Sequence, residues 1–85
     1  MSWRTIIFSN PCKLSIKSDN LLVAKDGCKT LIPINDIATI VLESNEIVLT
    51  TALLSRLAKN KSAIFSCGDS HLPNGIFLPF MQHSL

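Results

Sequence analysis

The sequence predicts an α+β fold that is mainly β, in which short antiparallel strands precede one strand–helix–strand unit and an extended C-terminal connector. Two turn-forming pairs, Asp19-Asn20 and Asp26-Gly27, separate short apolar segments early in the chain. A β-branched run at residues 37–42 is followed by helical spacing and by a second apolar run at residues 63–67. The strand and helix patterns stop after Gly68.

The N-terminal part is expected to be an antiparallel meander of four short strands. Trp3 to Phe8 forms the first strand, which ends at Asn10-Pro11 because proline cannot donate a hydrogen bond to a ladder. Residues 13–17 alternate polar and apolar side chains, as a strand with one solvated face does. Residues 21–24 and 29–32 supply the other two strands, each after one of the turn pairs.

The strand–helix–strand unit begins where the segment from Pro33 to Asp36 redirects the chain into the strand at residues 37–42. Helical spacing starts at Ile47, with Thr50 or Thr51 as the N-cap. One helix face is apolar, and basic residues gather at the C-terminal end, where they favour the helix dipole. Asn60 is expected to take the left-handed conformation that ends the helix. The connection between the two strands should be right-handed.

The expected domain organisation is a β-rich domain over residues 1–68 and a connector over residues 69–85. The connector holds Pro73, Gly75 and Pro79 among isolated apolar residues, a composition that favours unpaired, extended chain. Because a globular core rarely ends on a long unpaired segment, the connector is expected to lead toward a further domain.

The composition predicts more apolar surface than a small monomer can bury. A chain of 85 residues forms one small domain and buries roughly 60–65% of its unfolded surface. Yet 47% of its residues are hydrophobic, 16% are charged and the mean hydropathy is +0.36. The surplus could lie in a dimer seam, against a second domain or on a lipid surface, and a homodimer is the simplest of these explanations. Since no apolar run approaches the ~20 residues of a membrane span and the N-terminus lacks a signal-peptide pattern, the expected location is cytoplasmic, without a membrane partner.

Three cysteines, Cys12, Cys28 and Cys67, lie far apart in the sequence, and their odd number cannot pair fully within the chain. Reduced, buried thiols are therefore expected, as in a cytosolic protein. Cys67 and His71 could bind a metal together with Cys12 or Cys28, but the paired close spacings of a zinc site are missing, which favours ordinary thiols.

The basic residues are unevenly distributed. Net charge is +2, from eight basic and six acidic side chains, so bulk charge alone does not require a nucleic-acid partner. The segment before Pro33 nevertheless holds five basic and two acidic residues, which predicts a basic face on the N-terminal strands. Lys13 and Lys17 share one strand face with Ser15, where phosphate contact and simple solvation are equally favoured.

Motifs of catalysis are weak in this sequence. The phosphate-binding, dinucleotide-binding and zinc-protease signatures are missing. Asp69-Ser70-His71 contains the three residue types of a hydrolase triad, but sequence neighbours seldom have triad geometry, which favours a polar loop. Glu43 and Glu46 could act as an acid–base pair or hold a divalent ion, but a solvated turn near a helix N-terminus is favoured. The residues alone therefore predict a binding or scaffold module.

Several segments of the chain, taken in order, match a known family pattern. They are Ser2-Trp3-Arg4-Thr5, Cys12-Lys13-Leu14-Ser15, the strand from Ile37 to Ser44, the helix start Ile47-Val48-Leu49-Thr50-Thr51-Ala52-Leu53-Leu54, Ile64-Phe65-Ser66-Cys67-Gly68-Asp69, and Leu72-Pro73. As a set, they resemble the N-terminal β-rich domain of the CRISPR adaptation integrase, in the version found with a single large RNA-guided effector nuclease. The resemblance runs over essentially all 85 residues.

The resemblance implies a DNA endonuclease and integrase dependent on Mg²⁺ or Mn²⁺. Such an enzyme works with a second small CRISPR adaptation protein to insert foreign DNA as new spacers in antiviral defence. The resemblance places the catalytic residues in a helical C-terminal domain, so no catalytic residue, metal ligand or cofactor is assigned to this chain. The chain is then expected to be a fragment, inactive alone, that dimerises and holds the middle of a DNA duplex.

Five basic side chains are assigned to duplex binding on this basis: Lys13, Lys17, Arg56, Lys59 and Lys61. Their contacts would go to phosphates and would not depend on base sequence. Two alternatives stay open. One is a structural dimerisation module without direct DNA contact, and the other is a self-sufficient nuclease with Glu43, Glu46 and Asp69 as metal ligands.

Overall fold

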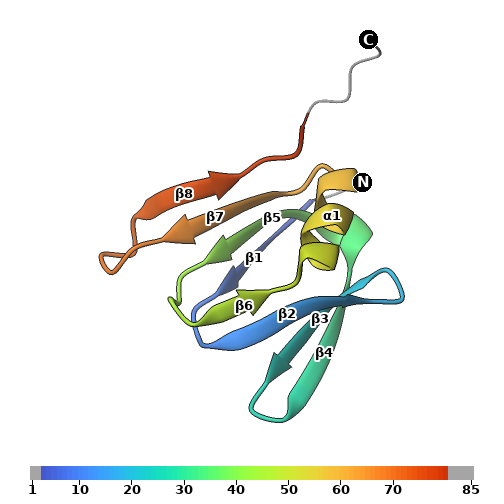
Figure 1. Ribbon diagram of the computed structural model, residues 1–85, viewed down its shortest axis with the longest axis horizontal. Helices are drawn as coiled ribbons and strands as arrows, with labels where there is room; N and C mark the ends of the chain where they lie inside the picture. The colour runs from blue at the N-terminus through green and yellow to red at the C-terminus, as the bar shows by residue number, and fades with distance from the viewer. Residues whose placement is uncertain (1–2, 81–85) are drawn as a thin grey trace.

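Two four-stranded sheets and one α-helix make up the computed structural model, which describes residues 3–80 (Figure 1). The first, which we call the crossover sheet, has the strand order β1 (Arg4–Phe8), β5 (Ile37–Leu42), β7 (Ala63–Cys67), β8 (Pro73–Phe77). The second, the hairpin sheet, has the order β4 (Cys28–Pro33), β3 (Asn20–Lys25), β2 (Cys12–Lys17), β6 (Ile47–Leu49). A 3₁₀ turn, η1 (Ile34–Asp36), joins β4 to β5, and α1 (Thr51–Lys59) joins β6 to β7. The expected α+β, mainly β class is confirmed.

The hairpin sheet contains two of the predicted hairpins. β2 pairs antiparallel with β3, and β3 pairs antiparallel with β4. Each connection is a two-residue turn with positive φ at both positions: 49° and 61° at Ser18 and Asp19, and 50° and 79° at Asp26 and Gly27. Such turns match the right-handed twist of paired strands. The first turn lies one residue earlier than expected, because Asn20 already pairs with the last residue of β2.

β1 does not belong to the predicted meander. It pairs in parallel with β5, with Ile6 opposite Ile40 and Phe8 opposite Leu42. The short link after β1 includes Pro11, which has no N–H to donate, and it carries the chain from one sheet to the other (Figure 1). Ile6 and Phe8 pack against the hydrophobic core in this arrangement, and the burial of their apolar surface favours it.

The strand–helix–strand unit is confirmed. β5 and β7 are parallel neighbours, with Ile40 opposite Ile64, and α1 lies between them in the chain. Thr50 is the N-cap, since its Oγ1 accepts a hydrogen bond of 3.2 Å from the Leu53 N–H. The expectation that the helix pattern starts at Ile47 is wrong, because residues 47–49 form β6 beside β2. Two of its three residues are β-branched, which fits a strand better than a helix start.

The segment expected to be an unpaired connector contributes a strand. β8 pairs antiparallel with β7, with Ser66 opposite Gly75. A Cβ at position 75 would lie 2.8 Å from the Ser66 Oγ, so the glycine permits this pairing. The Ser66 hydroxyl also donates to Asn74 Oδ1 at 2.8 Å. Pro73 occupies the first position of an edge strand, where a missing N–H is tolerated.

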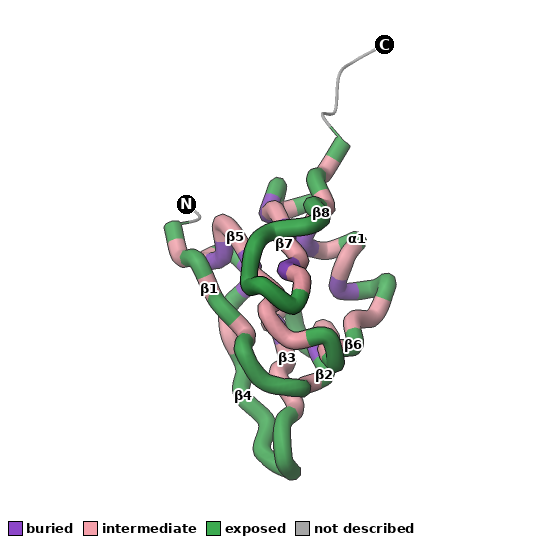
Figure 2. The backbone as a smooth tube through the Cα atoms, turned by 90° about the vertical axis from the view of Figure 1, so that its left-hand side faces the viewer, coloured by how far each residue is buried: buried purple, intermediate pink, exposed green. Residues whose placement is uncertain are grey.

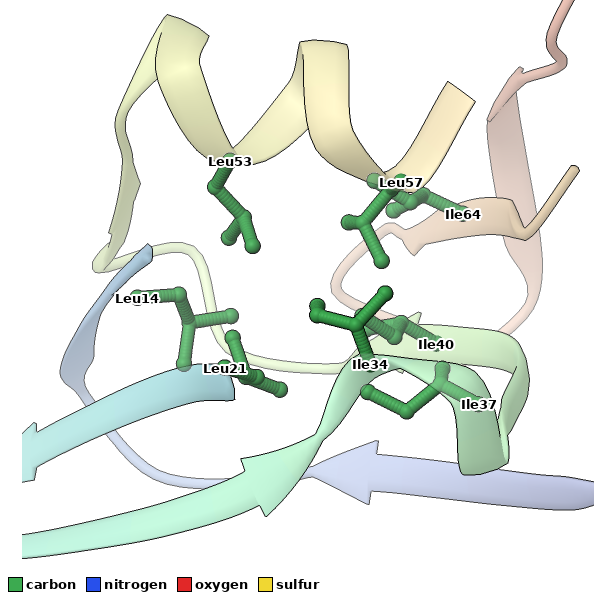
Figure 3. Close-up of a cluster of buried hydrophobic side chains, with 8 residues drawn as sticks. All are labelled: Leu14, Leu21, Ile34, Ile37, Ile40, Leu53, Leu57 and Ile64. Atoms are coloured by element: carbon green, nitrogen blue, oxygen red, sulfur yellow. The ribbon is translucent and has the colours of Figure 1, made fainter. Parts of the chain in front are cut away.

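The hydrophobic core lies between α1 and the facing sides of the two sheets (Figure 3). Figure 2 shows that burial concentrates where these elements meet and that the β3–β4 hairpin tip projects away from them. Eight apolar residues from both sheets, η1 and α1 form the buried cluster: Leu14, Leu21, Ile34, Ile37, Ile40, Leu53, Leu57 and Ile64.

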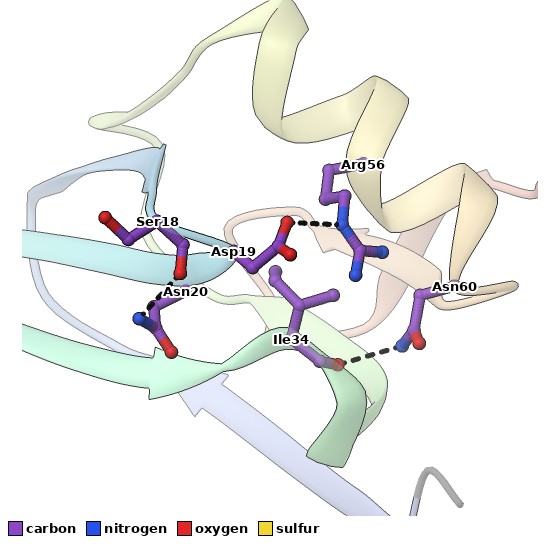
Figure 4. Close-up of polar contacts among 6 residues, drawn as sticks. All are labelled: Ser18, Asp19, Asn20, Ile34, Arg56 and Asn60. Carbon is purple, nitrogen blue, oxygen red and sulfur yellow. Dashed lines mark hydrogen bonds and ion pairs between the residues drawn. The ribbon is translucent and has the colours of Figure 1, made fainter.

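Hydrogen bonds from Asn60 and Ser62 connect the end of α1 to η1 and β5. The Asn60 Nδ2 donates to the carbonyl oxygen of Ile34 at 2.9 Å (Figure 4) and to that of Ile37 at 3.0 Å. The fully buried Ser62 donates from its hydroxyl to the Ile37 carbonyl at 2.8 Å. The expected left-handed conformation of Asn60 is wrong, since its φ is −79°, and Lys61 adopts that conformation instead, with φ of 62°.

Candidate nucleic-acid interface

Two of the predicted DNA-binding residues lie on the outer face of the hairpin sheet. Lys13 and Lys17 are exposed on β2, whereas Leu14 between them is fully buried. Because successive side chains of a strand point to opposite faces, the two lysines point away from the core. Leu14 and Leu53 belong to one buried cluster, which places α1 on the inner face of this sheet (Figure 3).

The other three predicted residues lie at the C-terminal end of α1. Arg56 is partly buried, and its Nε donates to Asp19 Oδ1 at 3.1 Å, an ion pair between the helix and the β2–β3 turn (Figure 4). Lys59 and Lys61 are exposed. Since α1 covers the inner face of the hairpin sheet, the five predicted residues form two separate basic surfaces.

Strand register adds a residue that sequence reasoning did not assign. Lys13 lies opposite Ala24, and Ala24 lies opposite Lys29 on β4, so Lys29 shares the outer face with Lys13 and Lys17. We call this surface the lysine face. Apolar side chains lie between the three lysines. Among the described residues, no Asp or Glu points outward from the four strands of this sheet. The excess of basic residues before Pro33 includes Lys29, but only the strand register shows that Lys29 lies on this face.

The acidic residues of the sequence hypotheses lie apart in separate polar contacts. Glu43 Oε1 accepts from the Ser9 hydroxyl at 2.9 Å, and Asp69 Oδ1 accepts from the Asn45 amide at 3.0 Å. Within residues 3–80, no three His, Cys, Asp or Glu side chains come together as metal ligands. The nuclease alternative with Glu43, Glu46 and Asp69 is therefore wrong for this part of the chain. The described residues do not fit the divalent ion that the resemblance implies, and we assign no catalytic step to them.

The cysteine metal-site alternative meets the same objection, because no cluster of three ligands forms among the described residues. Cys67 is buried, Cys12 is half-buried and Cys28 is exposed, so the expectation of buried thiols is wrong for Cys28. Burial raises the pKa of the Cys12 thiol above its usual range, and the positive charge of Lys25 acts in the opposite direction. All three thiols are free.

No helix in residues 3–80 has the length and apolar character to cross a membrane.

Comparison with known proteins gives concordant matches. Residues 5–85 match the family model described as CRISPR associated protein Cas1. The CRISPR-associated endonuclease Cas1 of Neisseria meningitidis serogroup C (strain 8013) is 36% identical over 83 residues, which make up 98% of this chain and 27% of that protein. This chain thus spans about a quarter of the length of that relative.

Solved structures share the fold. A CAS1 protein from Thermotoga maritima matches with a TM-score of 0.80 and 17% identity, over 89% of this chain and 25% of that one. The TtCas1–DNA complex matches with a TM-score of 0.73 and 14% identity, over 89% and 25% of the two chains. A Cas6-RT-Cas1–Cas2 complex matches with a TM-score of 0.81 and 18% identity, over 91% and 9%. At these identities the likeness concerns the arrangement of strands and helix.

Proposed function

The chain belongs to the Cas1 family, and on that basis we propose that it is the dimerising, duplex-holding β-domain of a CRISPR-associated DNA endonuclease and integrase that inserts foreign DNA as new spacers. The name of the Neisseria relative, an endonuclease, supports the activity of the whole protein. The solved complexes of related folds with DNA and with Cas2 support DNA and a second adaptation protein as partners. The proposal includes a cytoplasmic location and the use of Mg²⁺ or Mn²⁺ by a catalytic part outside the residues described here.

The observation that carries DNA holding is the lysine face. Lys13 and Lys17 stand four residues apart on one strand, about 13 Å at ~3.3 Å per residue, and Lys29 stands two strands away, roughly 10 Å from Lys13. Phosphates follow each other every ~3.4 Å along one DNA strand axis, so flexible lysines at these spacings can each reach a phosphate. With no carboxylate among the outward residues of its strands, this face attracts a polyanion. Arg56, Lys59 and Lys61 remain a predicted second contact on the helix side, available to a different stretch of DNA.

The experiment is a titration of a fluorescently labelled duplex at several salt concentrations. Each lost phosphate contact reduces the slope of log K against log salt by about 0.9, so Lys13→Ala/Lys17→Ala should reduce it by about 1.8. Lys29→Ala should reduce it by about 0.9. Lys25→Ala is the matched control, because this exposed lysine lies near Lys29 but on the inner side of the same sheet. Lys59→Ala/Lys61→Ala measures the helix-side contact separately.

Equal slopes for the parent, the double variant and the Lys25 control would contradict duplex binding by the lysine face. Weak binding of different duplex sequences with equal affinity is expected, because phosphate contacts carry no base information. If the chain dimerises but binds no duplex at low salt, the alternative of a structural dimerisation module without DNA contact holds instead.

A further inference from the structure

Among the asparagines of this sequence, only Asn74 is followed by a glycine. The backbone nitrogen that follows an asparagine can attack the side-chain amide, and a glycine hinders this attack least, because it has no Cβ. Asn74 and Gly75 lie on β8, the outer strand of the crossover sheet, which is exposed over most of its length (Figure 2). Water therefore reaches both residues.

The pairing of β8 with β7 is irregular at Asn74. Ser66 lies opposite Gly75 and Cys67 lies opposite Pro73, so Asn74 is the extra residue of a β-bulge. A bulge disrupts the ladder locally, and an exposed edge strand opens at a low cost in free energy. The backbone at Asn74 can therefore change its conformation while the hydrophobic core stays packed.

The side-chain amide of Asn74 lies beside a hydroxyl group that also contacts the next residue. The Ser66 Oγ donates to Asn74 Oδ1 at 2.8 Å, and the same Oγ would lie 2.8 Å from a Cβ at position 75. On its other side the amide lies close to Gly68, where a Cβ would be 3.3 Å from Asn74 Nδ2. The Ser66 hydroxyl is thus next to both the amide carbonyl and the backbone of Gly75.

We propose that Asn74 is a site of spontaneous deamidation and that Ser66 promotes the reaction. The deprotonated backbone nitrogen of Gly75 forms a bond to Asn74 Cγ, and negative charge develops on Oδ1. The Ser66 hydroxyl donates to this oxygen and stabilises the charge, as an oxyanion donor does. The bond from Cγ to Nδ2 then breaks, and the nitrogen takes a proton from water and leaves as ammonia. Water opens the cyclic imide at either carbonyl, so the products are aspartate and isoaspartate.

The isoaspartate product changes the backbone of β8. It carries the chain through the former side-chain carbon, which adds a backbone atom just before residues 75–77. These residues pair with β7, with Phe77 opposite Ile64, and Phe77 packs against the hydrophobic core. The added atom shifts this pairing, so the modification should loosen β8. The reaction depends on neither DNA binding nor dimerisation and goes beyond the proposed function.

The test follows the mass of one tryptic peptide while the folded chain is incubated at mildly alkaline pH. Trypsin cleaves after Lys61, and residues 62–85 contain no further Lys or Arg and no asparagine other than Asn74. The mass gain of an amide-to-carboxyl conversion in this peptide measures deamidation. Chromatography separates the aspartate and isoaspartate forms.

Asn74→Gln is the matched control, because it keeps an amide whose longer side chain cyclises more slowly. The mass gain should disappear in this variant, which also excludes a contribution from Gln82 in the same peptide. The peptide of residues 18–25 contains Asn20, which Leu21 follows, and its mass should not change in the same digest. A parent chain whose residues 62–85 gain no mass overturns the proposed site.

A second variant tests Ser66. Ser66→Ala should slow deamidation of the folded chain about fivefold, the value of one neutral hydrogen bond to the reacting oxygen. In urea, which unfolds the chain, the variant and the parent should react equally fast. Ser70→Ala, at an exposed position in the β7–β8 loop, should change the rate less than about twofold. Far-UV circular dichroism checks that the variants fold.

An unchanged or faster reaction of folded Ser66→Ala, or equal slowing in urea, overturns the role of Ser66. Should that variant fail to fold, Ser66→Cys, with a weak donor, takes its place, and an unchanged rate has the same meaning. The fully modified parent should unfold at a thermal midpoint about 4–8 °C lower than fresh protein, whereas Asn74→Gln incubated alongside should not change. An equal midpoint for modified and fresh parent overturns the loosening of β8.

Discussion

In each sheet, three neighbouring strands keep their register, and the two sets of three do so by different means. In the hairpin sheet, β2, β3 and β4 follow one another through two-residue turns, so the backbone of each turn sets the pairing. In the crossover sheet, β1 and β5 are separated by residues 9–36, and β5 and β7 by residues 43–62. No turn can align such distant strands, so packing of the inward side chains and the contacts at the end of α1 must do so. The crossover sheet should therefore depend more on the core than the hairpin sheet does.

The largest effect should come from shortening a core side chain of the crossover sheet. Ile40 is fully buried at the centre of this sheet, and Ile40→Ala should reduce the free energy of unfolding by about 3–4 kcal/mol. That is a large share of the total for a chain of this size, which we expect to be roughly 4–13 kcal/mol. Urea unfolding monitored by circular dichroism measures the loss. Thr39→Ala, one residue away but facing outward, should cost less than about 1 kcal/mol, and equal losses at the two positions would refute the dependence on the core.

A smaller loss is expected when the end of α1 is detached from the crossover sheet. Asn60→Ala removes the amide that donates to the carbonyl oxygens of Ile34 and Ile37, and it should lower the free energy of unfolding by about 2 kcal/mol. Asn60→Asp keeps the size but lacks the donor, so it should be at least as destabilising in the same urea titration. Asn45→Ala removes an exposed amide contact to Asp69 and serves as the control, with a loss below about 0.5 kcal/mol. A stable Asn60→Asp variant would show that these hydrogen bonds do not hold the junction.

The smallest effect should come from the hairpin sheet, at a turn. Gly27 has φ of +79°, and a Cβ there would meet no atom within 4 Å, so Gly27→Ala tests backbone conformation without steric contact. The left-handed conformation should cost an alanine about 1 kcal/mol of stability. The thermal unfolding midpoint provides the measurement, with Asp26→Asn at the neighbouring turn position, φ 50°, as a control that tolerates this conformation. A loss as large as that of Ile40→Ala would remove the distinction between the two sheets.

The elements that the sequence predicted well are those determined by neighbouring residues. The turn pairs identified the hairpins to within one residue, and Thr50 was among the expected caps of the helix. β1 was predicted as a strand but assigned to the wrong sheet, and β6 was missed, because each pairs with a partner distant in sequence that a short apolar segment does not specify. β8 was missed although it pairs with the preceding strand, β7. A Pro and a Gly inside residues 73–77 indicated a connector, whereas in the structure Gly75 lies opposite Ser66, whose Oγ would be 2.8 Å from a Cβ at position 75.

The same limit applies to the candidate interface. Sequence reasoning identified the basic side chains, and alternation along β2 placed Lys13 and Lys17 together. It did not assign Lys29 to the lysine face, because that assignment depends on the registers of two successive hairpins. It also did not show that Arg56 lies on a different surface from the lysines of the strands. The sequence likewise did not predict that Ile7, Val41, Phe65 and Ile76 lie side by side across the crossover sheet, since they come from strands whose neighbours were not predictable. The surplus of apolar residues was evident from composition, but its location required the pairing of the strands.

The parallel pairing of β1 with β5 also has a consequence for biosynthesis. β1 ends at Phe8 and its neighbour ends at Leu42, so the ribosome must add residues 9–42 before the first strand has its partner. At about 5–20 residues per second, β1 emerges roughly two to seven seconds before β5. During this interval β2, β3 and β4 can already pair through their local turns. The nascent chain therefore exposes Ile6 and Phe8 for seconds, and these residues are where we expect chaperones to engage it first.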